Sequence, residues 1–122
     1  MFESAALGRS YPAKEYAAIE SELRMNLFKA QGFCIEHKLP VLITITGVDG
    51  SGLGAIANML SEWMDAKTIR NHVFWMQTDE ERTRPDAWQF WNKLPAGGEI
   101  GVFLGGWYDG TLRRFGCGEI SE

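Results

Sequence analysis

The stretch VLITITGVDGSGLG, residues 41–54, decides which fold this sequence predicts. Residues 41–46 are apolar or β-branched throughout, which is the pattern of a short strand buried on both faces, as in a parallel sheet. A glycine-rich loop follows, and apolar residues then recur along one side of a helix that begins near Gly52. We therefore expect a strand, a glycine loop and a helix in this order.

The segment between Pro12 and Pro40 is expected to be a helix. Pro12 suits a first turn, and Pro40 closes the segment. Apolar residues recur within it at steps of three or four and form a stripe: Tyr16, Ile19, Leu23, Leu27, Ala30 and Cys34.

Two further strands are predicted, one at residues 72–76 (HVFWM) and one at residues 99–104 (EIGVFL). Between them, TDEE at residues 78–81 has the form of a capping box, and Pro85 fits the first turn of a short helix. Another helix is expected to begin near Thr111.

Strands that alternate with helices imply an α/β fold, with a parallel sheet and helices on its faces. Only about three strands are visible, whereas a doubly wound sheet usually has more, so this sheet would end on an unpaired edge. We expect one domain over residues 1–122 that is incomplete by itself. It is either a fragment or in need of a partner that covers the edge.

The composition narrows the class of protein. Hydrophobic residues make up 45% and charged residues 23%, as in ordinary globular proteins, and no apolar run is long enough to span a membrane. The start of the chain lacks the features of a secretory signal, so a cytoplasmic location is expected. Cys34 and Cys117 stand alone, and neither His37 nor His72 has zinc-ligand spacing to them.

The net charge of −4 bears on possible partners. Nucleic acid and inorganic polyphosphate are dense polyanions, and proteins that hold them usually present a basic face. The Lys and Arg residues are scattered here, so we expect no nucleic-acid partner and only weak binding of polyphosphate by this chain alone.

Residues 47–54, GVDGSGLG, have the outline of the phosphate-binding loop G-x-x-x-x-G-K-[ST]. Gly47 and Gly52 hold the two glycine positions, but Leu53 replaces the lysine and Gly54 replaces the hydroxyl residue. Leucine neither donates a hydrogen bond nor neutralises charge, and losing one preorganised electrostatic contact typically costs on the order of 10²–10³ in rate. The pattern alone leaves open a structural glycine turn and a degenerate phosphate-binding loop.

Other polar and aromatic residues have two interpretations each. Glu80 and Glu81 form either a catalytic carboxylate pair or, as we favour, the acidic start of a helix. Asp109 is either a site residue or a turn residue. The aromatic residues are expected in the core rather than at a base-stacking surface: Trp88, Phe90, Trp91, Trp107 and Tyr108.

Three stretches together resemble the polyphosphate kinase 2 family: MFESAALG, VLITITGVDGSGLG and TDEERTRPDAWQFWNKLPAGGEIGVFLGGWY. The sequence is most similar to the N-terminal half of the two-domain polyphosphate:AMP phosphotransferases. The resemblance covers almost the whole chain, and its tryptophan-rich motif is far more specific than the glycine loop. It implies a P-loop kinase-like α/β fold and magnesium-dependent transfer of phosphate between polyphosphate and nucleotides.

The chain also departs from the active family. Its active loop resembles G-x-D-x-x-G-K-G, which Gly54 and Asp49 match and Leu53 does not. The family's aspartate–arginine–serine before Trp-Tyr appears here as Leu-Gly-Gly at residues 104–106, and the arginine of its W-R-F-W stretch is Gln89. Phosphoryl transfer depends on positioning and charge stabilisation, so Leu53, Gln89, Leu104 and Gly105 together suggest that this chain is inactive alone.

The resemblance therefore implies a degenerate domain with a scaffold or regulatory role. The N-terminal half of the two-domain members is expected to be similarly degenerate, and their C-terminal half to carry the activity. A catalytic domain or a second copy is the expected protein partner, and Mg²⁺ is implied by the family alone. The expected phosphate-binding residues are Gly47, Asp49, Gly50, Ser51, Gly52 and Gly54, with Asp49 also the candidate metal ligand. Residual phosphotransferase activity and a pure interaction module remain the alternatives.

Overall fold

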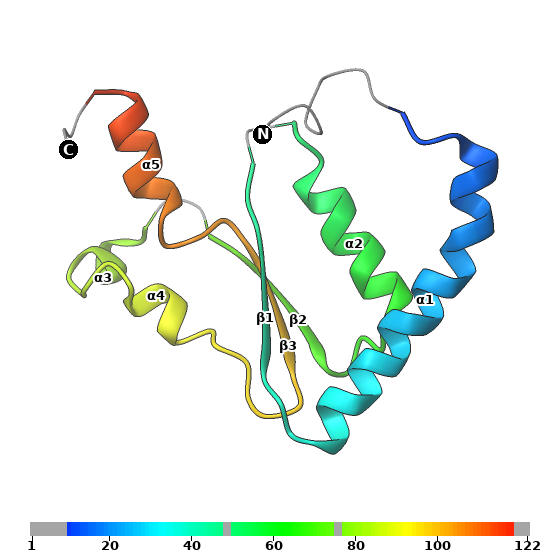
Figure 1. Ribbon diagram of the computed structural model, residues 1–122. Coiled ribbons are helices and arrows are strands. Elements are labelled where there is room, and N and C mark those ends of the chain that lie inside the picture. The colour runs from blue at the N-terminus through cyan, green and yellow to red at the C-terminus, as the bar shows by residue number, and fades with distance from the viewer. Residues whose placement is uncertain (1–9, 48–49, 75–76, 119–122) are drawn as a thin grey trace.

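The computed structural model describes residues 10–47, 50–74 and 77–118. Its elements in chain order are α1 (Ala13–Glu36), β1 (Val41–Ile45), α2 (Leu53–Trp63), β2 (Ile69–Val73), α3 (Asp79–Arg82), α4 (Trp88–Trp91), β3 (Ile100–Leu104) and α5 (Asp109–Gly116). Figure 1 shows α1 and α2 on one side of the sheet and α3, α4 and α5 on the other. The expected α/β class is confirmed.

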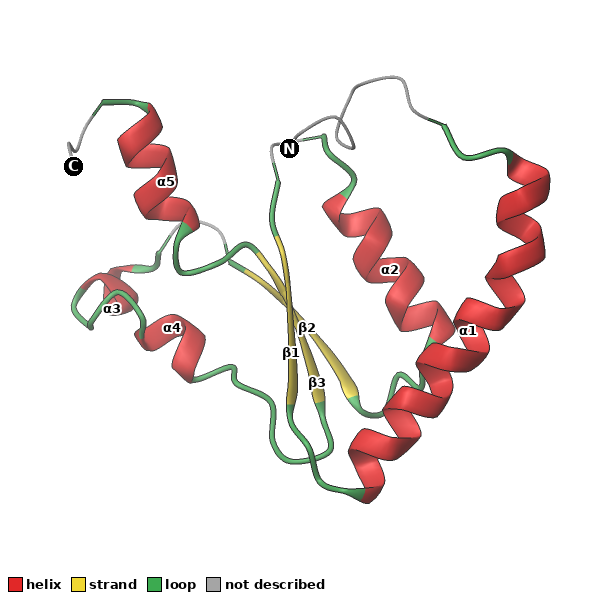
Figure 2. Ribbon diagram, in the orientation of Figure 1, coloured by secondary structure: helices red, strands yellow, loops and turns green. Residues whose placement is uncertain are grey.

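The three strands form a parallel sheet in the order β1-β3-β2 (Figure 2). The central strand β3 is in register with both neighbours, because Ile100 pairs with Val41 and Ile69. The carboxyl ends of the three strands therefore meet at one edge of the sheet. In open α/β sheets this is the edge at which ligands bind.

Two apolar layers cover the central strand. On the α1/α2 side, Ala57 of α2 and Met64, the residue after this helix, pack with Ile69, Ile100 and Val102 in the main core cluster. Through these residues the apolar side of the helix packs on an apolar face of the sheet, as is usual in the core of an α/β protein.

An aromatic cluster lies on the other side of the sheet. Phe103 is fully buried there, with ring centroids 4.7 Å from Phe74 and 6.3 Å from Phe90. The prediction that the aromatic residues are core is correct for buried Phe90 and wrong for Trp91 and Trp107, which are 61% and 54% exposed. The sequence did not separate the buried residue from the exposed ones, because Phe90 and Trp91 are adjacent aromatic residues in α4.

Helix α1 does not bury the stripe that its sequence predicts. The buried residue of this helix is Gln31, whereas Ile19 and Leu23 of the stripe are 38% and 42% exposed. The helix meets α2 partly through polar groups, including an ion pair of 2.8 Å between Arg24 Nη2 and Glu62 Oε1.

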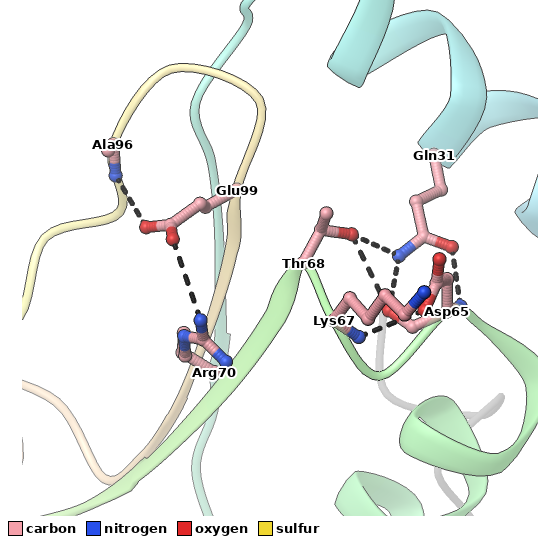
Figure 3. Close-up of polar contacts among 7 residues, drawn as sticks. All are labelled: Gln31, Asp65, Lys67, Thr68, Arg70, Ala96 and Glu99. Carbon is pink, nitrogen blue, oxygen red and sulfur yellow. Dashed lines mark hydrogen bonds and ion pairs between the residues drawn. The ribbon is translucent and has the colours of Figure 1, made fainter.

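Gln31 ties α1 to the turn between α2 and β2 (Figure 3). Its side-chain amide donates to Asp65 O at 2.9 Å and to Thr68 Oγ1 at 2.6 Å. Its carbonyl oxygen accepts from the Asp65 backbone N–H at 2.7 Å. A buried amide with these partners satisfies the polar groups that the turn would otherwise leave unpaired.

Two predicted strands differ from the observed ones. Residues 72–76 were expected as a strand, but β2 is Ile69–Val73, and residues 75–76 lie outside the described residues. Strand β2 lies at an edge of the described sheet, so it tolerates the exposed polar residues Arg70 and Asn71. Because these residues are polar, the sequence did not indicate that the strand begins before residue 72. Strand β1 was expected to be buried on both faces, yet it also lies at an edge and its five residues are half-buried.

The remaining predictions on the elements are close to the structure. Helix α2 begins at Leu53, directly after Gly52, and α5 begins at Asp109, slightly before the expected Thr111. The opening stretch of the family resemblance, residues 1–8, lies outside the described residues. Within the described ranges, we find no helix with the length and apolar character needed to cross a membrane.

Candidate functional site

The loops after the three strands are tied together at one edge of the sheet. The Gly105 N–H donates to Ile45 O at 3.0 Å, and the Phe74 N–H donates to Leu104 O at 3.0 Å. The glycine loop after β1 and the glycine pair after β3 therefore start from adjacent points. Together with Leu104, the last residue of β3, they hold three of the four residues that are expected from the sequence to depart from the active family, the other two being Leu53 and Gly105.

Two glycines give the loop after β1 its shape. Gly50 and Gly52 have φ angles of 81° and 87°, in the left-handed region that glycine adopts without steric cost. Gly52 is also the N-cap of α2, and its carbonyl oxygen accepts from the Ile56 N–H at 3.1 Å. The strand, loop and helix thus follow each other as predicted, and the first turn of α2 holds no acidic residue that would repel an anion.

The side chains of Ser51 and Leu53 lie close over Gly47. A Cβ atom placed on Gly47 would be 2.5 Å from Ser51 Oγ and 3.3 Å from Leu53 Cδ2. The half-buried Leu53 therefore turns an apolar group toward the loop at the position where the family pattern has a lysine. Asp49, the candidate metal ligand, lies outside the described residues.

The turn after β3 is built on glycine. Gly105 has a φ of 96°, and a Cβ atom there would lie 3.1 Å from Phe74 O. A Cβ atom on Gly106 would lie 3.0 Å from the Tyr108 ring. An arginine and a serine at these two positions would therefore displace the present backbone or its neighbours.

Asp109 closes this turn. Its Oδ2 atom accepts a hydrogen bond of 2.8 Å from the Gly106 N–H, and the residue starts α5. Of the two interpretations of Asp109, the geometry favours the turn residue, because the carboxylate already holds the backbone of the loop.

The capping box at residues 78–81 is confirmed. Thr78 Oγ1 accepts from the Glu81 N–H at 3.3 Å, and Glu81 Oε2 accepts from the Thr78 N–H at 2.8 Å. The Glu81 carboxylate is thus engaged in capping α3, as favoured over a catalytic pair with the exposed Glu80.

Gln89, which stands where the family pattern has an arginine, lines a cavity of about 340 Å³ beside β2. His72 and Lys93 also line this cavity. Burial lowers the pKa of His72, and the positive charges of Lys93 and Arg70 lower it further. Sequence reasoning did not connect Lys93 with this site, because Lys93 lies in the turn after α4.

The described residues do not supply a metal centre. Within residues 10–47, 50–74 and 77–118, we find no group of three or more His, Cys, Asp or Glu side chains that could hold a metal ion. Phosphotransferases of the polyphosphate kinase 2 family generally use Mg²⁺. Among the described residues, Asp109 already accepts a hydrogen bond from the Gly106 N–H, and Asp49, the candidate metal ligand, lies outside them, so the expected role of Mg²⁺ stays a prediction.

The family model described as polyphosphate kinase 2 matches residues 11–114 of this chain. A polyphosphate:AMP phosphotransferase of Pseudomonas aeruginosa is 40% identical over 123 aligned residues, which cover 100% of this chain and 25% of the relative. Its counterpart in Pseudomonas syringae is 40% identical over 114 residues, which cover 93% of this chain and 23% of the relative. The chain therefore spans about a quarter of the length of these relatives.

Solved structures of polyphosphate kinase 2 proteins also match this chain. A polyphosphate kinase 2 structure from Pseudomonas aeruginosa matches 100% of this chain and 27% of its own, with a TM-score of 0.88 and 40% identity. A polyphosphate kinase 2 structure from Arthrobacter aurescens matches 94% of this chain and 42% of its own, with a TM-score of 0.79 and 25% identity.

Proposed function

This chain belongs to the polyphosphate kinase 2 family, and we propose that it serves as a scaffold or regulatory domain of a polyphosphate-dependent AMP or ADP phosphotransferase. In this role it does not catalyse phosphate transfer alone. Any polyphosphate or nucleotide that it holds is bound weakly, through the backbone of residues 47–54. The catalytic groups then come from another domain.

The position of Leu53 is the observation that carries this proposal. Backbone N–H groups of a glycine loop and a helix start bind phosphate, but the loop lysine supplies the charge that reaches the transferred group. Here a leucine methyl approaches Gly47 at that place, so the loop keeps its backbone and lacks its cation. Because phosphoryl transfer depends on charge stabilisation, a loop of this kind positions phosphate without activating it.

The turn after β3 supports the same conclusion independently. It has Leu104 and Gly105 where the active family has an aspartate and an arginine, and its backbone follows a left-handed glycine conformation. Gln89 further replaces an arginine beside the same sheet. The proposed losses thus fall in three segments, which are the loop after β1, helix α4 beside β2 and the turn after β3.

A phosphotransfer assay tests the proposal. The purified chain is incubated with polyphosphate, Mg²⁺ and AMP or ADP, and nucleotide products are separated by chromatography, with the Pseudomonas aeruginosa relative as a positive control. We expect no turnover above the background without protein. Robust magnesium-dependent turnover by this chain would overturn the scaffold role.

Residual activity is the alternative that the loop itself favours, because its glycines keep the conformation of a strand–loop–helix site. Asp49 would then be the metal ligand, and Asp49→Asn should remove whatever activity the wild-type chain has. Equal activity of the variant and the wild type would exclude this role of Asp49.

A further inference from the structure

Helix α1 carries large apolar side chains on the side that faces away from the sheet. Its inner side packs through Leu27, which contacts the core cluster, and through the buried Gln31. Met25 and Phe28, by contrast, are 53% and 57% exposed. Figure 1 shows α1 on the outside of the layer that it forms with α2. Apolar side chains gathered on an exposed helix face are typical of an interaction surface.

The exposed side of α1 follows a seven-residue repeat. Apolar and small residues recur there at alternating steps of three and four, which are the a and d positions of a helix that pairs with another helix. We call six exposed residues at these positions the α1 seam: Ala18, Ser21, Met25, Phe28, Gly32 and Ile35. The seam runs along most of a helix of 24 residues, which is long enough for a short helix pair.

A groove lies beside the middle of the α1 seam. It has a volume of about 320 Å³, and Ser21, Met25 and Phe28 line it together with Arg24 and Trp63. The guanidinium carbon of Arg24 lies 5.1 Å from the centroid of the Trp63 ring, so these two side chains form one wall. Helices pair when a side chain of one enters a hole between side chains of the other. The groove supplies such a hole.

The α1 seam is complementary to itself when two copies run antiparallel. In that arrangement the a positions of one helix lie opposite the d positions of the other. Met25 then faces Phe28 of the second copy, so the two largest side chains fill the centre. Ser21 faces Gly32 of the second copy, and these small residues let the helices approach closely on both sides of the centre.

The charges beside the α1 seam favour the same orientation. Glu22 and Lys29 are exposed and flank the seam on one side, one heptad apart. An antiparallel pair places Glu22 of each copy beside Lys29 of the other, and the twofold symmetry makes two such ion pairs. A parallel pair would instead place equal charges side by side. The charge pattern therefore selects an antiparallel second copy.

We propose that the α1 seam binds the α1 seam of a second copy of this chain, antiparallel, with Phe28 of each copy in the groove of the other. The sequence leaves a catalytic domain and a second copy open as partners, and the seam assigns this face to the second copy. A helix pair of this kind buries roughly 1,000 Å² in total, at the lower end of specific interfaces, so we expect a Kd on the order of 10–100 µM. This proposal concerns assembly and holds whether or not the chain catalyses.

Charge exchange tests the antiparallel pairing. Sedimentation equilibrium of the purified chain measures the Kd. Glu22→Lys and Lys29→Glu should each weaken self-association by about tenfold, because both ion pairs become repulsive. An equimolar mixture of the two variants should regain the wild-type Kd, since every flanking pair again joins opposite charges. The double variant Glu22→Lys/Lys29→Glu should also regain it, and Asp86→Lys, an exposed change outside α1, is the matched control.

Truncation of Phe28 tests the groove. Phe28→Ala removes the central side chain from both copies and should weaken self-association by about 100-fold. Phe33→Ala is the matched control, because Phe33 is 55% exposed but lies on another face of α1. Its Kd should equal that of the wild type. Circular dichroism should show the same helix content in both variants, since both side chains are exposed.

Three results would overturn the proposal. In the first, the chain stays monomeric up to about 500 µM, well above the affinity expected for an interface of this size. This result would leave the seam to another part of the polypeptide, which the Pseudomonas relatives contain. In the second, the chain dimerises but the mixed charge variants do not regain the wild-type Kd. In the third, Phe28→Ala and Phe33→Ala change the Kd equally.

Discussion

Gly105→Ala should destabilise the fold by about 3 kcal/mol, although it adds a single methyl group. The φ of Gly105 is 96°, and a left-handed conformation costs an L-residue about 1–2 kcal/mol. The new Cβ would also lie 3.1 Å from Phe74 O, whose residue is held by its own hydrogen bond to Leu104. Forcing extra volume into such a fixed site costs about 1–3 kcal/mol more.

The assay is thermal unfolding followed by circular dichroism. For a chain of this length, about 3 kcal/mol corresponds to a midpoint lower by roughly 12 °C. Gly110→Ala is the matched control, since a Cβ atom there meets nothing within 4 Å and alanine favours the helix. Its midpoint should be unchanged or higher. A shift of less than about 3 °C for Gly105→Ala would refute the strain assigned to this turn.

Three further outcomes are expected. Gln31→Leu should lower the free energy of unfolding by about 3 kcal/mol, because it leaves the Asp65 and Thr68 polar groups unpaired near the core. Urea titration measures this free energy, and an unchanged urea midpoint would contradict the prediction. The lowered pKa of His72 means that the unfolded chain binds a proton more readily, so stability should fall as pH drops through the usual histidine pKa near 6.5. In His72→Asn this part of the pH dependence should disappear, and a profile identical to wild type would exclude His72 as its source. Leu53→Lys should strengthen polyphosphate binding in calorimetry without producing turnover, and turnover by this single variant would show that the turn after β3 is not limiting.

Much of the fold follows from local patterns in the sequence. The unbroken apolar run of β1, the capping box at residues 78–81 and the helix after Gly52 are local signals, and the structure contains all three. Each depends on residues close together in the chain, so spacing alone is sufficient to place it.

The features that were wrong or missed depend on distant partners. Gln31 is the buried residue of α1 although it is polar, and its role is visible only with its hydrogen-bond partners Asp65 and Thr68, which are 34 and 37 residues away. The same holds for β2, whose exposed Arg70 and Asn71 follow from its place at an edge of the described sheet. Sequence spacing cannot show which strand lies at an edge, because strand order is a property of the whole fold.

In the candidate site too, some features follow from the local sequence and others only from contacts between distant residues. Leu53 is visible in the sequence as a missing lysine, and its half-buried side chain can be exchanged without a change of backbone. The sequence also indicates that Gly105 stands in place of an arginine, but only the structure shows a backbone in which a side chain would be strained against Phe74. In the proposed scaffold role, the loop would thus differ from an active one in charge, and the turn would differ in backbone geometry. Restoring the lysine would return an attraction for phosphate, but the arginine of the active family has no unstrained place until the turn between Leu104 and Asp109 is rebuilt.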